Sequence, residues 1–170
     1  SIPQTLTQLT HLDISEGKAQ ELNLPGSLPN LEILNLRSLP LTQLELPDGM
    51  TQLREIDLVY ANLTELRIPE GLDSLERIEL DAPLPRFQDP LQSVEFPSEL
   101  PRLRAFSLGS RKVEALTFPH QLNALTNLTL RFNAQLDDLK LPEEMNQLES
   151  FTLWGSPVSS LELPERLDTG

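Results

Sequence analysis

The 170-residue chain contains no cysteine. This absence excludes disulfide bridges, thiolate zinc sites and cysteine nucleophiles together. No stretch approaches the roughly 18 consecutive apolar residues that a membrane-spanning helix needs, and no signal peptide is visible. Because the chain begins at Ser1 rather than at methionine, an N-terminal signal could have been removed. The sequence therefore leaves two locations open, the cytoplasm and, for a bacterial protein, the outside of the cell.

Positive charge and aromatic residues are also scarce. Lysine and arginine total 13 against 26 aspartates and glutamates, the net charge is −13, and aromatics make up 5%. Such a surface repels phosphate backbones and anionic membranes, so we expect neither nucleic acid nor membrane insertion. A protein or peptide with a basic surface is the favoured partner. The plainer interpretation is that the charge keeps the protein in solution.

Proline and leucine, by contrast, are abundant and regularly spaced. Eight prolines each follow an aliphatic residue or phenylalanine, at steps of 22, 22, 22, 28, 22, 23 and 22 residues. Leucine and its aliphatic substitutes keep the same register between the prolines. The prolines are Pro3, Pro25, Pro47, Pro69, Pro97, Pro119, Pro142 and Pro164. A period of this length indicates a stack of repeated structural units.

Each unit is expected to hold two short strands, because Leu-x-Leu places two side chains on one face of an extended segment. In the third unit these are strand A at Leu44–Leu46 and strand B at Ile56–Leu58. Pro47 ends strand A, since proline has no N–H to donate, and Met50 to Leu53 forms a tight corner. One unit buries too little apolar surface to fold alone, so like strands must stack into two parallel sheets.

The segments LPDGMTQLREIDL and LPEEMNQLESFTL resemble the leucine-rich repeat pattern LPxxLxxLxxLxLxxNxLxxLP. The chain departs from that pattern in keeping the turn asparagine only at Asn133, and in writing strand A as LxxLxLP. It therefore resembles an irregular, mostly bacterial variant with the 22-residue unit LxxLxLPxxLxxLxxLxLxxxx. The resemblance implies a curved, right-handed solenoid with little helix, whose concave strand B sheet binds proteins or peptides and does no catalysis.

Residues 1–170 are expected to form a single domain of about eight coils, of which the first and last are incomplete. No capping motif is present, which favours a fragment of a larger protein over ends covered by a partner. The step of 28 predicts an inserted loop at 81–90. That loop is either a neutral bulge or a binding element, and Arg86 and Phe87 are its candidate contacts.

No catalytic or metal-binding constellation is apparent. The two histidines, His11 and His120, fall in units several coils apart, and no Walker, Rossmann, GxSxG or HExxH motif occurs. Acidic pairs such as Glu143 and Glu144 are typical of a solvated surface. We therefore expect no enzymatic activity, no catalytic residue, no metal and no cofactor.

The candidate partner-binding surface is the outward face of the strand B sheet, where the only tryptophan and the only tyrosine fall. Aromatic residues and arginine dominate interface hot spots, and acidic residues form a second feature on the same face. Gly109 and Ser110 would leave a gap between the two features, whereas the strand A side should be a solvated wall. The predicted contacts are Tyr60, Arg37, Glu55, Asp57, Glu79, Arg131, Phe132 and Trp154.

Two alternatives compete with these interpretations. Trp154 and Phe132 could instead fold over the turn edge or pack against a neighbouring domain. The favoured function is a protein- or peptide-binding module, the targeting part of a larger bacterial protein. The alternative function is a structural solenoid that self-associates by stacking through its open ends.

Overall fold

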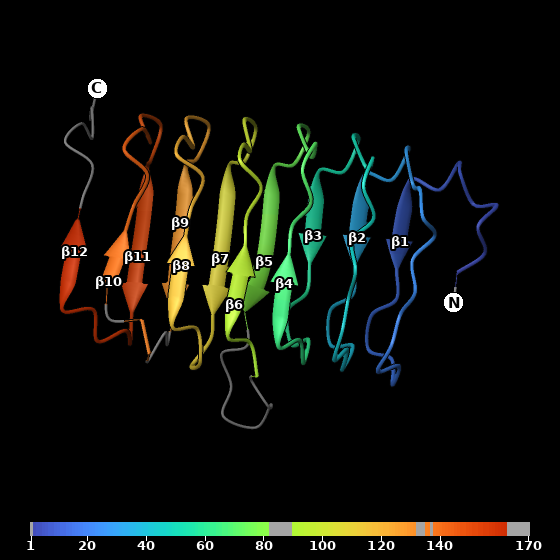
Figure 1. Ribbon diagram of the computed structural model, residues 1–170, viewed down its shortest axis with the longest axis horizontal. Coiled ribbons are helices and arrows are strands. Elements are labelled where there is room, and N and C mark those ends of the chain that lie inside the picture. The colour runs from blue at the N-terminus through green and yellow to red at the C-terminus, as the bar shows by residue number, and fades with distance from the viewer. Residues whose placement is uncertain (1, 82–89, 132–134, 137, 163–170) are drawn as a thin grey trace.

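The computed structural model describes residues 2–81, 90–131, 135–136 and 138–162. These residues form twelve strands and no helix (Figure 1). A seven-stranded sheet has the order β1-β2-β3-β5-β7-β9-β11, and two smaller sheets have the orders β4-β6-β8 and β10-β12. The seven-stranded sheet contains β1 (His11–Asp13), β2 (Ile33–Asn35), β3 (Glu55–Asp57), β5 (Arg77–Asp81), β7 (Ala105–Gly109), β9 (Asn127–Arg131) and β11 (Ser150–Trp154). The smaller sheets contain β4 (Glu65–Arg67), β6 (Ser93–Glu95), β8 (Ala115–Thr117), β10 (Asp138–Lys140) and β12 (Ser160–Glu162).

The chain runs in one direction along the seven-stranded sheet and returns along the opposite wall, so the arrows of the two walls point in opposite directions (Figure 1). Every strand pair is parallel, and the register follows the repeat. Leu34 lies opposite Leu12 on one side and Ile56 on the other. Across the insertion the step becomes 28, with Leu80 opposite Leu108 and Leu66 opposite Val94. The predicted parallel-stranded repeat solenoid is confirmed, and six additional residues interrupt neither sheet.

The core is the column of inward side chains between the two walls. Leu34, Ile56 and Ile78 are fully buried, as alternation along a strand requires. At the corner, the N–H of Leu53 donates to the carbonyl of Met50 at 3.0 Å, and the equivalent bond recurs in the other complete coils. The predicted tight corner between the two walls is therefore present.

The middle of the core is aromatic rather than aliphatic. Phe106 of β7 lies edge-on to both Phe96 and Phe118, with ring centroids 5.2 and 5.8 Å away. Phe96 and Phe118 are 5.4 Å apart. Edge-to-face geometry of this kind adds to simple burial, so three adjacent rings fill the space between the walls here.

The strand A side differs from the prediction in two ways. Leu44–Leu46 is not a strand, and the only pairing there is an isolated bridge between Glu21 and Gln43. Where strands do form, as in β4, they lie one residue earlier than predicted. β-Branched and aromatic residues, which favour strands, occur in the strand A segments 65–68, 93–96 and 115–118, and not in the two preceding segments, 21–24 and 43–46. Composition does not decide alone, since β10 and β12 pair without such residues.

Candidate functional site: two faces of the solenoid

The outer face of the seven-stranded sheet carries a row of four residues in register. Asp81, Gly109, Arg131 and Trp154 lie opposite one another on β5, β7, β9 and β11. Trp154 is 58% exposed, which makes it the most exposed large apolar residue of the described chain. Adjacent strands are about 4.8 Å apart, so the Trp154 and Arg131 side chains leave the sheet from neighbouring positions.

Arg131 reaches across β7 toward Asp81. The Arg131 Nη1 and Asp81 Oδ2 atoms are 4.0 Å apart, although a whole strand separates their backbones. Gly109 stands between them and has no side chain to obstruct this path. The same Asp81 oxygen accepts the hydroxyl hydrogen bond of Ser107 at 2.7 Å. Arg131 and Asp81 therefore form a long ion pair over the sheet, and the Arg131 side chain is still 45% exposed.

A second charge network lies toward the N-terminal end of this face. Arg37 donates from Nε to Asp57 at 2.9 Å, and its Nη2 atom is 3.3 Å from Glu79. Burial alone would lower the pKa of Arg37, but the hydrogen bond and charge of Asp57, together with Glu79, raise it overall. Arg77 also approaches Glu79, at 3.5 Å. The acidic feature predicted here is therefore compensated by arginine rather than exposed as bare negative charge.

Asp57 also ends its strand. Its Oδ1 atom accepts the N–H of Val59 at 3.0 Å. Asp13 and Asn35 hold the N–H two residues ahead of them in the same way, at 3.0 and 3.1 Å. This side-chain turn ends the strand conformation, although backbone hydrogen bonds between coils continue past it, from Leu58 to Glu79 and from Tyr60 to Asp81. In each coil the third residue after it has positive φ: Glu16 (56°), Ser38 (56°) and Tyr60 (63°).

Some predicted contacts are placed differently by the structure. Tyr60 does not lie on the strand face, because the Asp57 turn ends the strand before it; it is half-buried against Leu58 and Leu91. The gap predicted at Gly109 and Ser110 is wrong. Ser110 is fully buried, and its hydroxyl donates to the carbonyl of Leu91 at 3.0 Å.

The remaining predicted contacts divide into two groups. Glu55 lies half-buried on β3, opposite Arg77 of β5, so it belongs to the compensated N-terminal network. Phe132, Arg86 and Phe87 lie outside the described residues.

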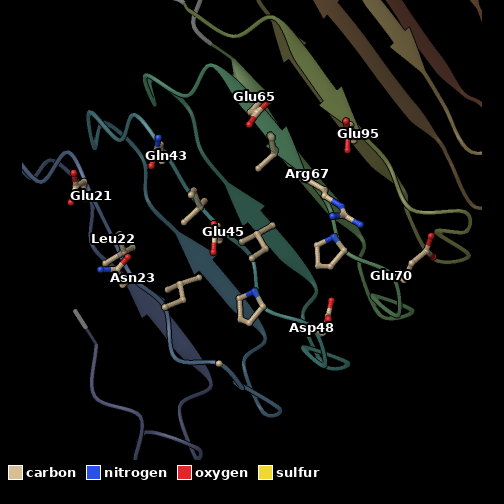
Figure 2. A pocket seen from close by; sticks show the side chains of 17 residues that line it. Glu21, Leu22, Asn23, Gln43, Glu45, Asp48, Glu65, Arg67, Glu70 and Glu95 are labelled. Atoms are coloured by element: carbon tan, nitrogen blue, oxygen red, sulfur yellow. The ribbon is translucent and has the colours of Figure 1, made fainter.

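The opposite wall contains a hollow that the sequence did not suggest. About 1070 Å³ of open space lies against residues 21–24, 43–48 and 65–70 (Figure 2). Its apolar lining includes Leu22, Leu24 and Leu46, which are only partly buried, whereas Leu34 on the other wall is fully buried. The hollow lies where the strand A ladder is missing, and residues expected to form a solvated wall, such as Gln43, Glu45 and Glu65, are exposed here.

The charge lining this hollow is almost entirely negative. Glu70 accepts hydrogen bonds from the N–H and hydroxyl of Ser98, at 2.9 and 2.8 Å. The other carboxylates have no side-chain partner within the described residues, and Arg67 is the single cation of the lining. Those carboxylates are Glu21, Glu45, Asp48, Glu65 and Glu95. In the sequence, this negative charge is indicated by the acidic residues that recur on the outward side of strand A.

Within residues 2–81, 90–131, 135–136 and 138–162, no group of three histidine, cysteine or acidic side chains could hold a metal ion. His120 is exposed and 3.8 Å from Glu143, in a coil remote from His11. The described part of the chain includes no helix that is long and apolar enough to cross a membrane.

Stacked coils of parallel strands with leucine at the inward positions define the class of leucine-rich repeat solenoids. The family model described as BspA type Leucine rich repeat region (6 copies) matches residues 86–169, so this part of the chain is similar to that leucine-rich repeat family. Members of this family are in general protein-interaction modules and typically binding scaffolds rather than enzymes. The comparisons with curated proteins and with solved structures found no match.

Proposed function

We propose that this solenoid is the targeting module of a larger bacterial protein and binds a protein partner on the outer face of its seven-stranded sheet. The observation that carries the proposal is Trp154, a large aromatic side chain 58% exposed at the end of β11. The role is binding alone, with no catalytic step.

The surroundings of Trp154 support this assignment. Tryptophan and arginine are the residues most enriched at interface hot spots, and here they lie side by side on adjacent strands. Ser107 fixes the Asp81 carboxylate, and the attraction of that carboxylate would favour the Arg131 conformation that lies over the sheet, which reduces the conformational entropy lost when a partner binds. Trp154 and Arg131 would form the centre of the interface.

The N-terminal half of the face would contribute specificity more than affinity. Arg37, Asp57 and Glu79 already satisfy one another, and Glu55 faces Arg77 on the next strand. A partner would meet alternating charges there, which fix orientation and disfavour unsuitable surfaces. Tyr60, half-buried at the turn, would lie at the edge of the contact area.

The test compares capture of binding partners by three versions of the chain. Trp154→Ala should weaken capture of the specific partner at least tenfold, since removing a hot spot costs about 2 kcal/mol or more. Leu6→Ala is the matched control, because Leu6 is 40% exposed at the other end of the stack. Captured proteins would be identified by mass spectrometry and their affinities measured by calorimetry. Equal loss in both variants, or none, would contradict the proposed surface.

A second candidate function is self-association. Leu6 and Leu161, on the first and last described coils, are 40% and 39% exposed, and end-to-end stacking of copies would cover them. This candidate predicts a concentration-dependent rise in mass by sedimentation equilibrium, and a lower association constant for Leu161→Ser. A strict monomer at high concentration would exclude it.

A further inference from the structure

We infer that the hollow on the strand A wall is a second docking groove, and that its occupant is an extended protein segment in which lysine or arginine alternates with aliphatic residues. This groove lies on the opposite wall from Trp154 and is independent of the function proposed above. Four features of the hollow support it: its shape, its partly buried leucines, its unpaired backbone and its charge.

The hollow exists because the wall is open. On the seven-stranded side every neighbouring pair of coils is hydrogen-bonded, as are β4, β6 and β8. Among the described residues, by contrast, no backbone hydrogen bond joins 43–45 to 65–67. All six residues of these two segments line the hollow. The edge of β4 that faces residues 43–45 is therefore unpaired, and such an edge can accept an added extended segment through main-chain hydrogen bonds.

The lining is suited to a segment with two kinds of side chain. Leu22, Leu24 and Leu46 leave apolar surface accessible, and Pro47 and Pro69 border it. Covering these side chains would remove apolar surface from water, which favours binding. An extended segment presents its side chains alternately to two sides, so aliphatic residues can meet the leucines while the intervening residues meet the rim.

The rim determines the charge of the occupant. The carboxylates of the other face are neutralised by arginine, as in the 2.8 Å pair of Arg37 with Asp57. In the hollow, five carboxylates have no side-chain partner within the described residues, and Arg67 is the only cation of the lining (Figure 2). They project from several successive coils rather than converging on one point. A ligand with several spaced positive charges complements this arrangement.

The test uses a short fluorescein-labelled peptide in which lysine alternates with valine. Fluorescence anisotropy should show saturable binding that weakens as salt is added. The Glu45→Gln, Glu65→Gln double variant should bind about fivefold more weakly, which is the scale expected for two exposed ion pairs. The matched control, Glu99→Gln with Glu114→Gln, removes the same charge from exposed positions outside the hollow and should bind as the natural chain does.

Circular dichroism would verify that both double variants remain folded. A peptide with glutamate in place of lysine should not bind, and Trp154→Ala should leave binding of the lysine peptide unchanged, which separates this groove from the surface proposed above. Absence of saturable binding, or equal weakening in the two double variants, would overturn the inference.

Discussion

The first three and the last four strands of the seven-stranded sheet differ in length, although they share one repeat. β1, β2 and β3 are three residues long, whereas β5, β7, β9 and β11 are five residues long. The third residue of each short strand is Asp13, Asn35 or Asp57. In the long strands it is Glu79, Ser107, Thr129 or Thr152. A short carboxylate or amide reaches the N–H two residues ahead and turns the chain, so one side chain determines where each strand ends.

The opposite wall also has an irregular and a regular part, but the boundary lies in a different coil. Residues 21–23 and 43–45 share a single bridge, whereas β4, β6 and β8 form a ladder. β4 and β5 follow one another in the same coil, and each begins the regular part of its own sheet. The hollow and the compensated charge network therefore both lie where the irregular coils meet the regular ones, at β2 to β5, and the aromatic core and Trp154 lie in the regular coils beyond them.

The largest expected difference between the regions lies in the core. Phe106→Ala should lower the free energy of unfolding by about 4 kcal/mol, because it removes the ring that contacts both Phe96 and Phe118. Leu34→Ala, at the equivalent inward position of β2, should cost about 3 kcal/mol. Urea denaturation measures both values. A larger loss for Leu34→Ala would show that the aromatic cluster adds nothing beyond burial.

The turn at the end of β3 should give the next largest effect. Asp57→Ala removes the acceptor of the Val59 N–H and the partner of Arg37, at a cost of about 2 kcal/mol. Asp57→Asn keeps the turn acceptor, as Asn35 does naturally, and should cost about half as much. Thr129 is the third residue of the long strand β9, as Asp57 is of β3, and Thr129→Ala should change the free energy of unfolding by no more than about 0.5 kcal/mol. Equal costs for the alanine and asparagine variants of Asp57 would eliminate the turn as a cause.

The smallest expected effect concerns the positive-φ residue after each turn. Ser38→Gly should stabilise the protein by about 0.5 kcal/mol, because φ of 56° is strained for a residue with a Cβ atom. Gly155 occupies the equivalent position of the β11 coil with φ of 68°, so Gly155→Ala should cost about 1 kcal/mol. Thermal melts of the pair provide the measurement. Effects of the same sign would contradict the interpretation.

The seven-stranded sheet could be predicted from sequence because its signal is local and repeated. Leu-x-Leu at a constant step fixes both the inward face and the register, and the structure confirms these for Leu34 and Ile56. The turns were also encoded: Asp13, Asn35 and Asp57 share one repeat position. Strand alternation alone does not reveal their turn chemistry, and it therefore predicts Tyr60 on the strand face.

The hollow and the ion pairs depend on distances between coils. An inward apolar pair occurs both at Leu44 and Leu46 and at Leu66 and Ile68, yet only the second overlaps a strand, β4. Whether two neighbouring segments pair depends on how closely their coils approach on that wall, and no local pattern sets this spacing. The compensation of Asp57 and Glu79 by Arg37 is likewise a diagonal contact between coils, visible only once the register is known.

Arg37 and Arg131 have one consequence for how the protein should melt. In the simplest description of a repeat array, each coil interacts only with its immediate neighbours, and unfolding spreads from an end one coil at a time. Arg37 reaches from β2 past β3 to Glu79 of β5, and Arg131 reaches from β9 past β7 to Asp81 of β5. Second-neighbour couplings therefore meet at β5 from both sides. The coil containing β5 should therefore couple the coils on its two sides into a larger cooperative unit. Unfolding that begins at either end of the stack should stop at β5.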